Sequence, residues 1–218
     1  MRDGRRAVNS IHKTRPYRML KEIHLSHLPQ QLAIFVALYK DVENASILRD
    51  QLLAGNAEFE YAFLDASMIL STSHVLASAF RAINDFMHNR LKSRNVHSET
   101  VFCLSPNNNI AESFRRFGVT ETTKNLIALK IAVTPDITFD SVEAHLDSAV
   151  KGTSVEFNDE NIKAVQDLAK IKKVYKLTNF GHENQKKGKT APHGISSDTP
   201  EKDLEMAVIG SMTLRGAT

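Results

Sequence analysis

The chain alternates short apolar runs with amphipathic stretches over most of its length. Residues 32–39 are continuously apolar, which is typical of a strand covered on both faces. Residues 126–133 form a second such run, and the aromatic residues around Tyr61 alternate with small or polar residues. Short apolar runs of this kind favour strands. The predicted strands are residues 32–39, 59–63, 101–104 and 126–133.

Helical periodicity separates these runs. It is clearest in residues 73–91, where apolar side chains recur every 3.6 residues and polar ones take the opposite face. In a last helix that begins at Pro200, apolar residues recur at every fourth position and form a stripe that needs a packing partner. Further helices are predicted after the capping residues Asn44, Asn109, Asp140 and Asn158 or Asp159, with stops at Gly55, Gly118 and Gly152.

The 218 residues fit one domain with an arm and a loop. Residues 1–18 lack periodicity and are interpreted as a disordered basic arm: a nucleic-acid tether, a weak targeting leader or, the favoured alternative, an artefact of start-codon choice. Residues 19–178 form the predicted domain. Residues 179–199 have the composition of a mobile loop, and residues 200–214 are the C-terminal helix of the same domain. Strands alternating with helices favour βαβ units and a parallel sheet.

The formal charge of +3 is unevenly distributed. Residues 1–24 contain seven Lys or Arg and two acidic residues, so the remainder, with 21 basic and 23 acidic residues, has a net charge of −2. Basic surface on the body is therefore local. Arg90, Lys92 and Arg94 form one such cluster, which Arg115 and Arg116 could enlarge. The alternative is that these cations only stabilise the C-terminal end of a helix.

Motifs for catalysis, phosphate binding and zinc binding are missing from the sequence, and no metal, cofactor or membrane span is expected. The single cysteine, Cys103, indicates a reducing compartment and is interpreted as core filler. Residues 107–109 are three asparagines ahead of a helix. They could bind an anion at the helix N-terminus, but a turn with an N-cap is the favoured interpretation.

One set of motifs resembles a known family. Asn95, His97 and Glu99 are followed by residues 104–110, of sequence LSPNNNI, and by Phe117 and Gly118. This series resembles the CGI-121/TPRKB family, the kinase-binding subunits of the KEOPS (EKC) complex. Residues 38–49 and 174–177 extend the similarity, which spans residues 31 to 214. The basic arm and the length of residues 179–199 depart from the family pattern.

The resemblance implies a compact α+β domain with a mixed or largely antiparallel sheet of about four strands, in contrast to the parallel sheet suggested by the pattern. It also implies a non-catalytic subunit, located in nucleus and cytoplasm, whose partners are the PRPK-type, kinase-like ATPase subunit of KEOPS/EKC and tRNA. Such a subunit binds the 3′ CCA end of tRNA, supports threonylcarbamoyl-adenosine modification next to the anticodon and, in fungi, is linked to telomere maintenance.

Two surfaces are assigned to these partners. The kinase-binding residues are predicted on the last helix, with packing on the protein's own sheet as the alternative. The tRNA-binding residues are predicted in the basic cluster. An enzyme that binds a small phosphorylated ligand through Glu99 and residues 107–109, or a structural adaptor without RNA contact, are the rival functions. The site residues are Leu204, Val208, Ile209 and Met212 for the kinase, and Arg90, Lys92 and Arg94 for tRNA.

Overall fold

The computed structural model describes residues 19–178 and 200–215. A five-stranded sheet lies at its centre, in which every strand pair is antiparallel. The strand order is β1-β2-β4-β3, and β5 pairs with β2 beside β1. The strands are β1 (Lys21–Ile23), β2 (Ile34–Lys40), β3 (Ala62–Asp65), β4 (Leu126–Ile131) and β5 (Thr153–Val155).

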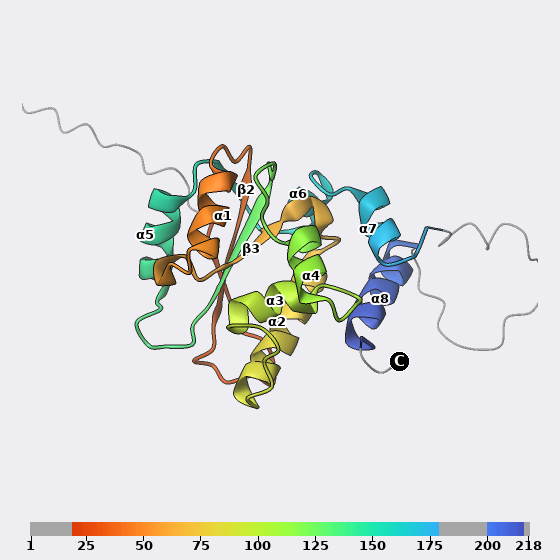
Figure 1. The fold of residues 1–218 in the computed structure, drawn as a ribbon, viewed down its shortest axis with the longest axis horizontal. Coiled ribbons are helices and arrows are strands. Elements are labelled where there is room, and N and C mark those ends of the chain that lie inside the picture. The colour runs from red at the N-terminus through yellow and green to blue at the C-terminus, as the bar shows by residue number, and fades with distance from the viewer. Residues whose placement is uncertain (1–18, 179–199, 216–218) are drawn as a thin grey trace, which may run out of the picture.

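Helices cover both faces of this sheet (Figure 1). One face is covered by α1 (Ala45–Leu53) and α5 (Phe139–Ala149). The helices on the other face are α2 (Thr72–Met87), α3 (Val96–Cys103), α4 (Ile110–Phe117), α6 (Asp159–Lys163), α7 (Leu168–Val174) and α8 (Pro200–Thr213). Two short 3-10 turns, η1 (Ala57–Phe59) and η2 (Ala66–Met68), flank β3.

The alternation of side chains along β2 explains why this strand is continuously apolar. Ile34, Val36 and Leu38 pack with α2, α3 and α8, whereas Phe35 and Ala37 pack with α1 and α5. All five side chains are buried because each strand face meets a helical layer. The two hydrophobic clusters thus lie on opposite faces of one sheet.

The α+β class with a largely antiparallel sheet is confirmed, and the parallel sheet suggested by the strand–helix alternation is wrong. Strands buried on both faces are most common in parallel sheets, but the sequence pattern reports burial and not direction. Here β2 pairs with β4 in register from Ile34 opposite Ile131 to Tyr39 opposite Leu126. The segment of more than 80 residues between these two strands includes the four helices α1 to α4 and β3, so no simple βαβ crossover joins them.

Residues 101–104 are not a strand. They lie at the end of α3, a helix in which Val96, Val101 and Phe102 are each at most 2% exposed. A helix that is buried almost all round shows no 3.6-residue periodicity, so its apolar run resembles a buried strand. The prediction also extended the strand around Tyr61 too far, because Phe59 lies in η1 and β3 begins at Ala62.

Two of the four predicted N-caps are confirmed and the other two are corrected. Asn109 and Asn158 accept hydrogen bonds from the first turns of α4 and α6. The capping box of α5 uses Thr138 and Ser141, two residues before the predicted pair. Asn44 precedes α1 without capping it, because its side chain bonds the backbone of residues 149 and 151 instead.

The helix predicted over residues 73–91 ends earlier, at Met87. Asn89 has a φ of 54°, a left-handed conformation that a continuing helix does not allow. The basic arm (1–18) and the predicted loop (179–199) lie outside the described residues. Within the residues that are described, no helix is long and apolar enough to span a membrane.

Candidate functional site

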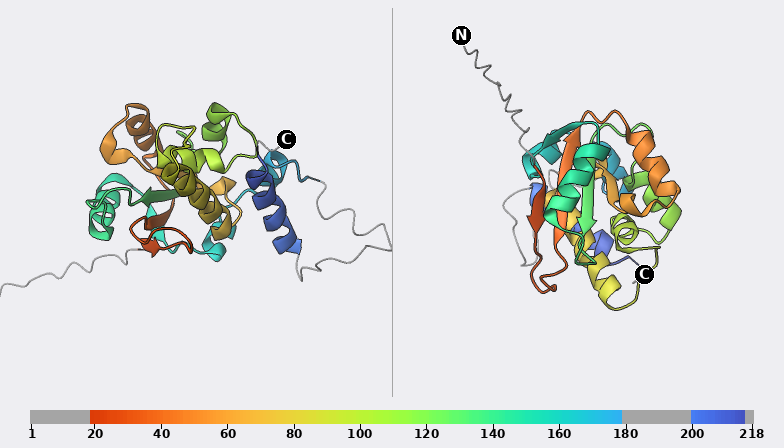
Figure 2. Two further views of the ribbon diagram at one scale, coloured as in Figure 1. Left: turned by 90° about the horizontal axis from the view of Figure 1, so that it is seen from below. Right: turned by 90° about the vertical axis from the view of Figure 1, so that its left-hand side faces the viewer.

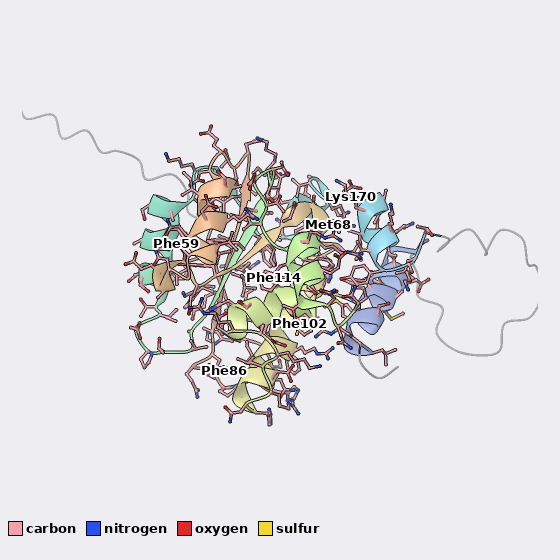
Figure 3. All side chains as sticks on the ribbon, viewed as in Figure 1. Phe59, Met68, Phe86, Phe102, Phe114 and Lys170 are labelled. Atoms are coloured by element: carbon pink, nitrogen blue, oxygen red, sulfur yellow. The ribbon has the colours of Figure 1, made fainter. Side chains whose placement is uncertain are left out.

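A groove of about 570 Å³ lies between α1, β3, α3 and α4. Its apolar wall includes Leu52, Phe63 and Val119, together with Phe114, which α4 contributes (Figure 3). Tyr61 and Phe63 are stacked with ring centroids 5.1 Å apart, and both are buried, so this wall is rigid. The polar rim includes arginines from three different elements.

These arginines differ in how they are paired. Arg49 on α1 donates to Glu121 at 2.9 Å, and Arg115 on α4 donates through Nε to Glu112 at the same distance. Arg94, in the connection between α2 and α3, is exposed and has no ion-pair partner within the described ranges. Its guanidinium lies beside Gly55, which has a φ of +70°. Arg94 is thus the cation of the groove that is free to meet an anion.

The first turn of α3 also borders the groove. Asn95 caps this helix by accepting a hydrogen bond from the amide of Ser98 at 2.8 Å, and both residues line the groove. The N-terminus of a helix carries a partial positive charge that favours anions. Arg94 and this end of α3 thus lie together on one side of the groove, whose lining also includes the carboxylates of Glu60 and Glu121.

The structure separates the three predicted tRNA-binding residues. Arg90, Lys92 and Arg94 are all exposed in the connection between α2 and α3, but only Arg94 lines the groove. Arg90 forms an ion pair with Asp85 at 3.2 Å. Sequence reasoning identified Arg115 as an extension of the cluster and missed Arg49, whose only signal was its place in a segment that resembles the family.

The motif formed by Asn95, His97 and Glu99 is structural in each of its polar positions. Asn95 caps α3, and the buried His97 accepts a hydrogen bond through Nε2 from the amide of Ile131 at 2.9 Å, which ties α3 to β4. Burial lowers the pKa of His97 to about 3. Glu99, which is 1% exposed, accepts hydrogen bonds from Lys92 and Ser93.

The three asparagines at residues 107–109 form the turn and cap that sequence reasoning favoured. The Asn107 side chain accepts a hydrogen bond from the Asn109 amide, and Asn109 caps α4. Ser105 donates to Asn107 at 3.1 Å. The enzyme hypothesis required Glu99 to meet a ligand, whereas its carboxylate is buried against the chain's own backbone.

The apolar stripe of α8 is not exposed, which corrects the prediction of an exposed docking stripe. Leu204, Val208 and Met212 are 6%, 0% and 2% exposed and belong to the core shared with α2 and the sheet. The alternative of packing on the protein's own core is the observed one. Of the four predicted kinase-binding residues, only Ile209 is partly accessible.

The two helices α2 and α8 pack against each other and lie side by side in the left view of Figure 2. Ser71 donates to Glu205 near the start of both helices, and Arg81 donates to the carbonyl of Met212 at 2.6 Å near their ends. On the sides of α2 and α8 that do not face the core, which are called their outer faces, several large apolar side chains are exposed to solvent. They are Phe80, Phe86 and Met87 on α2, of which Figure 3 labels Phe86, and Met206 on α8 with Leu214 directly after it.

One group of potential metal ligands occurs in the described part of the chain. Asp85, Glu99 and Cys103 have ligand atoms within 4.8 Å of one another. Burial raises the pKa of the Cys103 thiol to about 11, and the guanidinium of Arg215 contacts its sulfur at 3.8 Å. A protonated thiol beside a guanidinium is a poor ligand set, and Glu99 already accepts three hydrogen bonds.

These features define an α+β domain with two outward sites, a partly basic groove and an apolar helical face. The chain belongs to the family described as kinase binding protein CGI-121, which matches residues 39–216. It is 55% identical over 201 residues to an EKC/KEOPS complex subunit cgi121 of Aspergillus terreus, covering 91% of this chain and 98% of that protein. The subunit of the same name from Schizosaccharomyces pombe is 35% identical over 66% of this chain and 82% of its own length.

Proposed function

We propose that this chain is a non-catalytic subunit of a KEOPS/EKC complex that binds the kinase-like ATPase subunit and tRNA. Its role is to support threonylcarbamoyl-adenosine modification next to the anticodon. The observation that carries the RNA part is Arg94, an exposed guanidinium that has no carboxylate partner among the described residues and lines a groove with an apolar wall. A location in nucleus and cytoplasm and a part in telomere maintenance belong to the same proposal.

The groove suits the unpaired 3′ end of a tRNA. Unpaired nucleotides present base faces to apolar walls and phosphates to cations, and both kinds of surface meet here. The volume of about 570 Å³ accommodates only a few nucleotides, so the groove fits a chain end better than a duplex. Phosphate contacts of this kind bind without reading sequence and weaken with salt.

Charge reversal at the groove tests the RNA part. The triple variant Arg49→Glu, Arg94→Glu and Arg115→Glu is expected to lose most tRNA binding in a gel-shift titration and to show a smaller salt dependence. The matched control reverses Lys124, Lys151 and Lys173, three exposed lysines that do not line the groove. Equal losses for the two variants would indicate nonspecific attraction and contradict the groove assignment.

The kinase part of the proposal assigns the outer faces of α2 and α8 to docking. Both helices carry large apolar side chains that are exposed in the isolated chain, and such side chains are candidates for contact with a partner protein. Ile209 and Met206 lie on adjoining parts of α8, three residues apart, away from the buried stripe. The interface is therefore expected around the same helix as predicted, but on its opposite side.

Co-purification with the kinase subunit tests this assignment. The double variant Met206→Asp and Ile209→Asp is expected to stay folded by circular dichroism and to lose the kinase. Ile47→Asp is the control, because Ile47 is 52% exposed on α1, which covers the other sheet face. Retention of the kinase by the α8 variant would move the interface elsewhere.

A further inference from the structure

The connection between α2 and α3 is attached to the core by one buried carboxylate. A single oxygen of Glu99, Oε2, accepts hydrogen bonds from the amides of Lys92 and Ser93 at 3.0 and 2.8 Å and from the Ser93 hydroxyl at 2.6 Å. Glu99 is 1% exposed and lies in the first turn of α3. Three donors on one oxygen fix the backbone of residues 92 and 93 relative to the helix.

Capping α3 does not account for this arrangement. Asn95 already accepts the hydrogen bond that a capping side chain receives, from Ser98. Glu99 instead reaches back six and seven residues along the chain to the connecting segment. The carboxylate therefore orders the connection, in addition to placing a negative charge in the first turn of α3.

The residues on either side of Ser93 are the exposed cations Lys92 and Arg94. Residues 92–95 form a bend, and hydrogen bonds that hold the backbone of Ser93 also restrict where the two neighbouring side chains leave the surface. Arg94 leaves toward the groove, beside Gly55. The position of the free guanidinium thus depends on the hydrogen bonds to Glu99.

The surroundings of Glu99 place its carboxylate below the surface. Asp85 and Cys103 place oxygen and sulfur atoms within 4.8 Å of its own ligand atom, and the Arg215 guanidinium is near enough to interact with its charge. A ligand in the groove cannot reach a carboxylate in this position. Any effect of Glu99 on RNA binding must act through the connecting segment.

We propose that Glu99 is a positioning residue for nucleic-acid binding, which holds the connection so that Arg94 faces the groove before RNA arrives. This inference rests on the proposed tRNA binding. An ordered cation binds more tightly than a mobile one, because the cost of ordering has already been met in the free protein. Glu99 thereby supports affinity without touching the ligand.

A double-mutant cycle tests the proposal with the full chain and an unmodified tRNA transcript. Glu99→Ala is expected to weaken tRNA binding about tenfold in gel shifts while co-purification with the kinase subunit is unchanged. Arg94→Ala should cost much less affinity in the Glu99→Ala background than in the wild type. Glu99→Gln keeps an acceptor oxygen of the same shape and should restore most of the affinity.

A second variant covers the case in which Glu99→Ala does not fold. Ser93→Ala removes only the hydroxyl donor, and its cycle with Arg94→Ala should show coupling of the same sign. Additive losses in the cycle of the folded variant would overturn the inference and leave the proposed function intact. Absence of tRNA binding by the wild type would overturn the proposed function, and this inference with it.

Discussion

The guanidinium of Arg215 lies over the ring of Phe102, 3.8 Å from its centroid, and donates a hydrogen bond to the carbonyl of the same residue. Arg215 is 6% exposed and also donates to the Ser105 carbonyl. One side chain after α8 thus donates to a carbonyl near the end of α3 and to one just beyond it, and the Phe102 carbonyl also accepts a hydrogen bond from the Ser105 amide at 3.1 Å. It fastens the proposed kinase-binding helix to the helix that borders the groove.

Replacement of Arg215 by Met is expected to lower the free energy of unfolding by about 2 kcal/mol, because the two carbonyls lose a charged donor while remaining covered. Urea denaturation followed by circular dichroism measures this change. Arg90→Met is the control, since Arg90 is exposed and pairs only with Asp85, and it should cost well under 1 kcal/mol. Equal effects for both variants would show that the hydrogen bonds from Arg215 to the two carbonyls contribute nothing to the free energy of unfolding.

Because the apolar stripe of α8 is buried, a charged substitution in it is expected to destabilise the fold. An exposed stripe would tolerate the same substitution. Val208→Asp places a carboxylate at a position that is 0% exposed, so we expect α8 to leave the core and the thermal unfolding transition to fall sharply. Met206→Asp, two residues earlier and 56% exposed, should leave the transition within a few degrees. A Val208→Asp variant with wild-type stability would contradict the packing described for α8.

Stability should decline with acid because of two buried histidines. Burial lowers the pKa of His74 and of His97 to about 3, against about 6.5 in an unfolded chain. Between these values the unfolded state takes up protons that the folded state does not. Each histidine therefore contributes stability that is complete above pH 6.5 and is lost as the pH falls toward 3, by up to about 1.4 kcal/mol per pH unit.

Urea titrations between pH 7.5 and pH 4.5 measure this slope. His97→Gln retains an acceptor for the Ile131 amide and cannot be protonated, so its stability should depend less steeply on pH than that of the wild type. His88→Gln is the control, because His88 is exposed. If His97→Gln and the wild type share one slope, His97 is not the source of the acid sensitivity.

Gly55 links backbone conformation to the groove. At its φ of +70° an alanine is strained by about 1 kcal/mol, and the new Cβ would lie 2.8 Å from Nη1 of Arg94. Gly55→Ala should therefore lower stability slightly and weaken tRNA binding by displacing Arg94. Gly210→Ala is the matched control: no atom lies near its Cβ position within α8, so it should raise stability by up to about 1 kcal/mol and leave RNA binding unchanged.

The sequence pattern predicted elements best where the apolar positions repeat with a clear helical period or form an unbroken run of strand length. The helix now seen as α2 and the strands β2 and β4 were found because their apolar positions have a clear period or length. Helix α3 was mistaken for a strand because Val101 and Phe102 are buried among neighbours on every side. The direction of strand pairing has no local signal, which is why the antiparallel sheet followed from resemblance and not from periodicity.

For the candidate site, too, the sequence revealed only what a local pattern can show. Arg94 was recognised because it belongs to a local cluster of charge, whereas Arg49 lies 45 residues away and meets it only in the folded chain. In α8 the spacing of Leu204 and Val208 correctly showed an apolar face, but spacing cannot tell whether the covering surface is the chain's own core or a partner. Glu99 was noticed as part of a motif, and only the hydrogen bonds define its role.

The central claim is that the groove beside Arg94 holds the unpaired 3′ end of tRNA. The most direct measurement is a gel-shift titration of the wild type and Arg94→Glu with an intact tRNA transcript and with one that lacks its last three nucleotides. We expect the wild type to bind the intact tRNA at least tenfold more tightly than the shortened one, and Arg94→Glu to lose that difference. Equal affinity of the wild type for both RNAs would contradict the account.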